Sequence, residues 1–82
     1  MAGERKSDPV NQMYEERAKN LLKAELKRRG FTYRKLAESL AEMGIHETER
    51  NLNNKISRGG FSAAFLLQCL DAIAAQELRL HL

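Results

Sequence analysis

The chain has 82 residues, of which 43% are hydrophobic and 30% are charged, and its formal net charge is +3 at pH 7. This composition is typical of a soluble globular domain and excludes a disordered chain, while the length allows one modest core. The sequence has no apolar run of the roughly 18 residues that a transmembrane helix needs, and its first residues lack the apolar segment of a signal peptide. We therefore expect a cytoplasmic protein with no membrane partner. The single cysteine, Cys69, fits a reducing compartment.

The fold class follows from the turn residues and the hydrophobic period. Five glycines and one proline are too few for a β protein with many turns, and no stretch alternates cleanly. Residues 1–11 are polar and charged without an apolar period, so they predict a flexible N-terminal arm. Residues 12–82 are expected to form a single all-α, compact four-helix domain with short turns marked by glycine.

The first two helices are expected at residues 12–29 and 33–43. Each is followed by a glycine and then an apolar residue, Gly30-Phe31 and Gly44-Ile45, which is typical of a Schellman stop. Thr32 is a plausible N-cap of the second helix. The apolar residues that recur at the helical period predict the buried faces, which are Tyr14, Ala18, Leu21, Leu22 and Leu26 in the first helix and Tyr33, Leu36, Ala37, Leu40 and Met43 in the second.

The third helix is expected to start near residues 46–48 and to end at Gly59-Gly60. Leu52 and Ile56 are its only large apolar residues, and their spacing of four places them on one face. A helix anchored so thinly adds little to a core and offers its other face to a ligand. That face carries Arg50, Asn54 and Arg58, with Asn51 and Ser57 on its flanks.

The fourth helix is expected from Ala63 to about Gln76, with Ser62 as its N-cap. It is the most apolar segment, and its inward residues are predicted to be Phe65, Leu66, Cys69, Leu70, Ile73 and Ala74. Residues 77–82 carry leucines at alternate positions. They predict a continuation of the helix, a short strand or a tail that faces a partner.

The order of Leu36-Ala37, Gly44-Ile45, the sequence ISRG at 56–59 and Ser62 resembles the lambda-repressor/Cro-like helix-turn-helix domains over residues 32–75. This resemblance implies a domain that binds duplex DNA as a transcriptional regulator. The sequences LLKAELKRRGFTYRKLAESLAEMG and NKISRGGFSAAFLLQCL also resemble a family of small bacterial domains of unknown function. That second resemblance implies no activity.

If duplex DNA is bound, the third helix carries the best base readers, because Arg can fork onto guanine and Asn can pair with adenine. These are Arg50, Asn51 and Asn54, while Lys55, Arg58, Arg34 and Lys35 are better placed for phosphates and Ser57 flanks them. An exposed Lys or Arg is more often a solvated surface residue. The asparagines at 51, 53 and 54 are harder to explain that way, because Asn is a mediocre helix former.

Two departures from the repressor pattern favour an alternative. Residues 38–43 separate Ala37 from Gly44, and Glu47 and Glu49 stand at the start of the third helix, where carboxylates repel phosphates. The alternative is a protein–protein interaction adaptor that keeps the fold without binding DNA. A homodimer is expected, with the fourth helix and the leucine tail as candidate surfaces. An RNA-binding role is weaker, since no aromatic stacking platform is evident.

The sequence predicts no catalytic site. His46 and His81 lie far apart and show no metal-ligand spacing, and Cys69 falls on the apolar stripe of the fourth helix. We therefore expect a protein that is not an enzyme, with no metal and no small-molecule cofactor.

Overall fold

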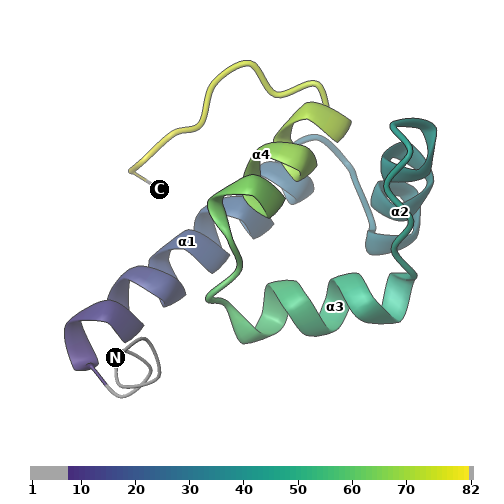
Figure 1. The fold of residues 1–82 in the computed structure, drawn as a ribbon. Coiled ribbons are helices and arrows are strands. Elements are labelled where there is room, and N and C mark those ends of the chain that lie inside the picture. The colour runs from purple at the N-terminus through teal and green to yellow at the C-terminus, as the bar shows by residue number, and fades with distance from the viewer. Residues whose placement is uncertain (1–7, 82) are drawn as a thin grey trace.

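The computed structural model describes residues 8–81. In this part of the chain there are four helices and no strand, so the all-α fold is confirmed. The helices are α1 (Pro9–Arg28), α2 (Tyr33–Glu42), α3 (Glu49–Arg58) and α4 (Ala63–Ala72). Helices α4 and α1 lie together in the middle of the molecule, with α2 at one end and α3 below (Figure 1). None of these helices combines the length and the apolar character that crossing a membrane requires. Of the predicted arm at residues 1–11, residues 1–7 lie outside the described residues, and residues 9–11 belong to α1 instead.

All four helices contribute to one hydrophobic core. The three short helices have ten residues each and α1 has twenty. Helix α2 packs against α3 and α4, and α3 also packs against α1. The buried side chains follow the predicted helical period in every helix. The cluster consists of Leu22, Leu26, Leu36, Leu40, Leu52, Ile56, Phe65, Cys69, Leu70 and Ile73.

Each of the three short helices has an N-cap residue with a side-chain hydroxyl. Thr32, Thr48 and Ser62 accept hydrogen bonds from the backbone N–H three residues further on, at 3.1, 3.0 and 3.0 Å. Each bond satisfies one of the N–H groups that the first turn of a helix leaves without an intrahelical partner. The predicted N-caps of α2 and α4 are confirmed, and α3 begins at Glu49, one residue after the predicted start at residues 46–48.

The ends of α1 and α2 also follow the sequence prediction. The N–H of Phe31 donates to the carbonyl of Leu26 at 2.8 Å, and that of Ile45 donates to the carbonyl of Leu40 at 2.9 Å. These are the long hydrogen bonds of two Schellman stops. One detail was wrong, because α2 ends at Glu42 and leaves Met43 43% exposed instead of buried.

Helix α1 begins at Pro9 and not near residue 12. The carboxylate of Asp8 accepts a hydrogen bond from the N–H of Val10 at 2.9 Å, and proline is favoured in the first helical turn because its φ is already helical. The buried residues of α1 all lie in its second half. The prediction that Tyr14 is buried was therefore wrong: its side chain is 60% exposed, because the first half of α1 extends past the shorter helices.

The end of α4 differs most from the prediction. The helix ends at Ala72 and not at Gln76, and Ala74 is exposed with a φ of 59°. The N–H of Ala75 donates to the carbonyl of Leu70 at 2.9 Å, so the chain makes a third Schellman stop with alanine in the usual glycine position. The remaining residues up to 81 form neither helix nor strand and run back beside α1 (Figure 1). This tail is held there by a 3.0 Å hydrogen bond from Arg17 to the carbonyl of Leu80.

Candidate nucleic-acid interface

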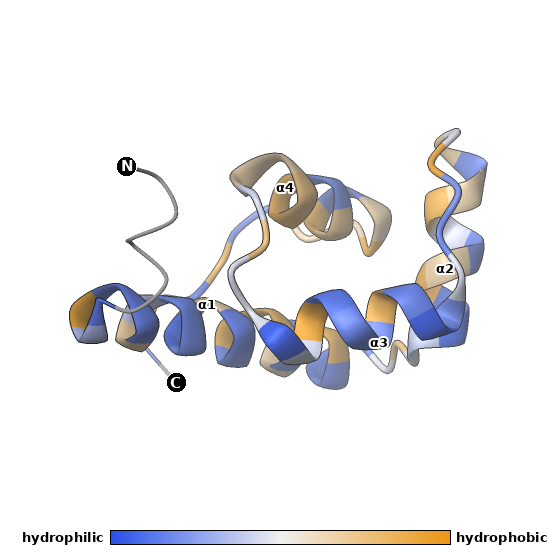
Figure 2. Ribbon diagram, turned by 60° about the horizontal axis from the view of Figure 1, so that its bottom comes forward, coloured by the Kyte–Doolittle hydropathy of each residue, from blue (hydrophilic) through white to orange (hydrophobic). Residues whose placement is uncertain are grey.

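Helix α3 separates its apolar and polar residues onto two faces. Leu52 and Ile56 are 0% exposed and pack into the core. In Figure 2, α3 is mostly blue and is interrupted by orange, as expected for a polar helix with few apolar residues. The residues predicted for the opposite face and its flanks are all exposed. They are Arg50, Asn51, Asn54, Ser57 and Arg58.

Most polar groups on this outer face have no partner in the part of the chain that the structure describes. Among residues 8–81, the side chains of Arg50, Asn51, Asn54 and Arg58 make no hydrogen bond and no ion pair. Ser57 differs from them, since its hydroxyl donates to Oδ1 of Asn53 at 3.0 Å. The outer face therefore presents guanidinium and amide groups that are free to bind a ligand.

Lys55 is engaged inside the molecule. Its Nζ lies 2.6 Å from Oε2 of Glu47 and 5.0 Å from the ring centroid of Phe65. The Glu47 side chain is only 13% exposed, so this carboxylate points at the lysine and not outward. Glu49 is then the single carboxylate at the start of α3 that faces solvent.

The two basic residues of α2 lie in its first turn and are exposed. Nε of Arg34 is 3.7 Å from Oε2 of Glu38, and both of these side chains are well solvated. Nζ of Lys35 lies 4.9 Å from the ring centroid of Phe31. Both cations therefore sit at the positive end of the α2 dipole, where an anion would be attracted.

The N-terminal ends of α2 and α3 meet beside α1. A pocket of about 400 Å³ lies between the three helices. A second pocket lies beside α3, and Tyr33 and Glu49 line both pockets. The first pocket adds two cations that the sequence prediction did not assign to the site, Lys23 and Lys27. Lys23 and Lys27 are four residues apart, so the sequence places them on one face of α1. The packing of α1 against α3 is what brings that face beside α3. The full lining of the first pocket is Lys23, Leu26, Lys27, Phe31, Thr32, Tyr33 and Glu49.

The one cysteine is packed in the core. Cys69 is 0% exposed, and burial, together with the nearby Glu47 carboxylate, raises the pKa of its thiol to about 12. A thiol with such a pKa carries almost no nucleophilic thiolate at neutral pH. Within residues 8–81, no group of three or more His, Cys, Asp and Glu side chains could hold a metal ion.

These features define a class of small four-helix domain whose third helix is anchored by two apolar residues and polar on its outer face. The chain belongs to the family described as "Domain of unknown function (DUF6471)", whose model matches residues 14–78. The predicted membership in a family of unknown function is thereby confirmed, and the helix-turn-helix resemblance stays a prediction. No curated protein matches the chain, and no solved structure does.

Proposed function

We propose that this protein is a cytoplasmic, non-enzymatic transcriptional regulator that binds specific sequences in duplex DNA through α3, in the manner of a helix-turn-helix domain. The observation that carries this proposal is the outer face of α3, where Arg50, Asn51 and Asn54 are exposed and their side chains have no partner among residues 8–81. Arginine and asparagine are the side chains that best read guanine and adenine edges in the major groove.

The exposed cations around α3 supply the phosphate contacts in this proposal. Arg58 is the last residue of α3, and Arg34 and Lys35 lie in the first turn of α2. Lys23 and Lys27 line the pocket between α1 and the N-terminal ends of α2 and α3. Contacts with phosphates fix the register of a protein on DNA, while contacts with bases select the sequence. Lys55 contributes less, because its ammonium is already paired with Glu47.

The engagement of Glu47 also removes one argument against DNA binding. Two carboxylates at the start of α3 would repel phosphates, but Glu47 is mostly buried against Lys55. Only Glu49 faces solvent there, and an exposed carboxylate near a helix start can accept a hydrogen bond from the amino group of cytosine.

A homodimer completes the proposal. A single small helical module buries little surface on DNA, and dimers of such domains bind two half-sites about one helical turn apart. Two copies would place two α3 helices on one face of a duplex. This dimer would require neither a metal nor a small-molecule cofactor.

The test is a titration of the full chain into a fluorescently labelled random-sequence duplex, followed by anisotropy at low salt. We expect binding at micromolar protein that weakens linearly in log salt, by about 0.9 slope units per phosphate contact. If no binding occurs at tens of micromolar protein, the proposal is wrong.

Single substitutions separate base reading from general charge. Arg50→Ala and Asn54→Ala should weaken binding to a selected sequence without lowering the melting temperature, since both residues are exposed. Lys27→Ala should weaken binding to every duplex equally and reduce the salt slope by about one. The matched control is Arg79→Ala, which removes the same charge as Arg50→Ala from the exposed tail beyond α4.

The second candidate is a protein–protein interaction adaptor with the same fold. An apolar groove on the first half of α1 favours it, because large exposed apolar surfaces mark protein interaction sites. In that case the anisotropy titration would show no binding, and Arg50→Ala would have no effect on partner capture.

A further inference from the structure

The first half of α1 exposes apolar side chains that a monomer leaves uncovered. Val10, Met13 and Tyr14 are 59%, 67% and 60% exposed, and no residue of this half is buried. Isolated helical turns are marginally stable in water and gain most of their stability from packing of an apolar face. This helical segment therefore has a face that would be stabilised by a partner.

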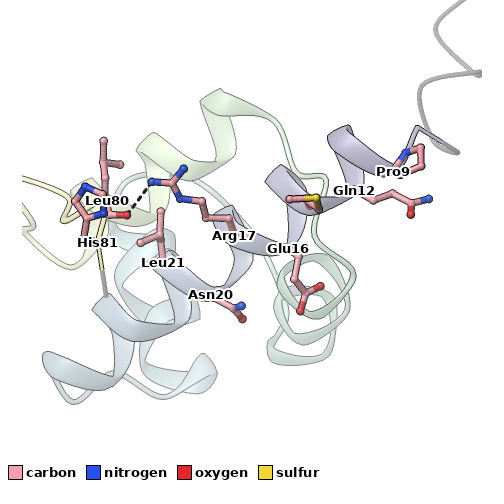
Figure 3. Close-up of a pocket in the computed structure, with 9 residues that line it drawn as sticks. Pro9, Gln12, Glu16, Arg17, Asn20, Leu21, Leu80 and His81 are labelled. Carbon is pink, nitrogen blue, oxygen red and sulfur yellow. Dashed lines mark hydrogen bonds between the residues drawn. The ribbon is translucent and has the colours of Figure 1, made fainter.

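An open groove of about 940 Å³ runs along this part of α1 and is closed on one side by the tail (Figure 3). Leu80 and His81 lie beside Arg17 and Leu21, and Pro9 and Gln12 lie toward the other end. The hydrogen bond from Arg17 to the carbonyl of Leu80 fixes the tail in place. The lining is mostly apolar in surface and consists of Pro9, Gln12, Met13, Glu16, Arg17, Asn20, Leu21, Leu80 and His81.

We infer that this groove is the homodimer interface and that its occupant is the same face of α1 and the tail from a second copy of the chain. The inference deepens the proposed function, since it rests on the homodimer proposed there. A two-fold interface needs a surface that carries both protruding and hollow parts. This face carries both, because Met13 and Leu80 are 67% and 57% exposed at the groove that they line.

The charges on the groove also favour a second copy. Glu16 and Arg17 both line it, and within one copy they contact Lys19 at 2.9 Å and the carbonyl of Leu80 at 3.0 Å, respectively. The Glu16 side chain is still 62% exposed, so a two-fold axis near these residues can add the partner copy's guanidinium to each carboxylate. The chain's own N-terminal residues 1–7 fit poorly as an occupant. Their sequence, MAGERKS, has three charged residues and only one large apolar one.

The position of the groove is compatible with simultaneous DNA binding. The tail that bounds it runs on one side of α1 and α4, and α3 lies on the other (Figure 1). A second copy in the groove would therefore leave the outer face of α3 uncovered. The groove with Val10 and Tyr14 offers fewer residues than the 20–30 per side of a stable interface, so we expect a weak dimer, with a Kd on the order of 10–100 µM.

The test combines sedimentation equilibrium with methyl NMR of the full chain labelled at its methionines. The chain has three methionines, and two of them, Met13 and Met43, lie in α1 and at the end of α2. We expect the Met13 methyl signal to shift as protein concentration rises from about 10 µM to about 500 µM, across the expected Kd. The Met43 signal should stay constant over the same range, and the mass should rise toward that of a dimer.

Matched substitutions then locate the interface. Met13→Lys and Leu80→Lys should abolish the dimer, while Met43→Lys and Leu67→Lys, at exposed sites outside the groove, should leave it intact. Circular dichroism melting of each variant confirms that it is folded. Loss of the dimer in Leu67→Lys but not in Met13→Lys would overturn the inference.

Two further outcomes separate this inference from the proposed function. A wild-type chain that stays monomeric at about 500 µM would overturn the inference, and the groove would then suit a helix of another protein. If the chain dimerises through Met13 but binds no duplex in the anisotropy titration, the inference stands and the DNA-binding proposal fails.

Discussion

The ammonium of Lys55 lies 2.6 Å from the carboxylate of Glu47, across the segment that begins α3. The same ammonium lies 5.0 Å from the ring centroid of Phe65, in α4. The pair therefore connects the loop before α3 with the last turn of α3 and with α4. It explains how a helix anchored in the core by only Leu52 and Ile56 is held in a fixed orientation.

A double-mutant cycle of Glu47→Gln and Lys55→Gln measures this connection. We expect a coupling free energy of about 1 kcal/mol from urea unfolding, because Glu47 is largely buried while Lys55 is 42% exposed and partly screened by solvent. The control cycle is Arg34→Gln and Glu38→Gln, whose side chains are 79% and 66% exposed. It should give a coupling close to zero, and equal couplings in the two cycles would contradict the structure.

The buried Cys69 thiol should resist modification in the folded protein. At pH 8 we expect a disulfide reagent such as Ellman's reagent to label the native chain only as fast as it unfolds, since the thiol is 0% exposed and burial raises its pKa to about 12. In denaturant one equivalent should react at once. Labelling of the native chain at the rate of a free thiol would show that α4 is not packed as described.

The same thiol makes stability depend on pH in the alkaline range. The unfolded state loses its thiol proton near the ordinary pKa of 9.0, while the folded state keeps it until about 12. The folded state binds more protons in this window, so the free energy of unfolding should fall as pH rises from 9 to 12. In urea unfolding over this pH range, the free energy of unfolding of Cys69→Ala should fall less steeply with pH than that of the wild type. If the two proteins show the same pH dependence, the thiol does not cause it.

The turn between α3 and α4 should not tolerate a side chain at Gly59. Its φ of 72° and ψ of −169° are essentially restricted to glycine, and a Cβ there would lie 3.2 Å from the backbone oxygen of Glu15. We expect Gly59→Ala to reduce the free energy of unfolding by roughly 2–3 kcal/mol. Gly44→Ala is the matched control, because that position has a positive φ but open space around it. Its cost should be about 1–2 kcal/mol.

Ala74 offers a substitution that should stabilise the protein. It occupies the glycine position of the Schellman stop of α4 with a φ of 59°, which costs an L-residue with a Cβ roughly 1–2 kcal/mol. We expect Ala74→Gly to raise the free energy of unfolding by about 0.5–1 kcal/mol, after the greater freedom of glycine in the unfolded chain is subtracted. Ala72→Gly, at the last residue of α4, should instead lower the free energy of unfolding, because glycine is a poorer helix former than alanine. A loss of stability in Ala74→Gly would contradict the positive φ.

Local signals predicted the starts and stops of the helices well where they depend on a few neighbouring residues. Thr32 and Ser62 are the N-caps of α2 and α4, and Gly30 and Gly44 lie in the Schellman stops of α1 and α2. Caps and Schellman stops are formed by hydrogen bonds within about five residues, so nearby sequence is enough to predict them. The predicted start of α1 was wrong although the sequence contains a local signal for it, the Asp8-Pro9 pair. The end of α4 was missed because alanine rarely takes a positive φ.

The sequence by itself determined the all-α class, the faces of the helices that point inward and the polar outer face of α3. These depend on the period of the α-helix, which is the same in every environment. Only the tertiary structure decided which of those polar groups stay free. It paired Lys55 with Glu47, brought Lys23 and Lys27 beside α3, and left Tyr14 and Met13 exposed on a helix longer than its neighbours. Each of these outcomes depends on how helices and loops pack against one another, and hydrophobic periodicity within a single helix carries no information about that packing.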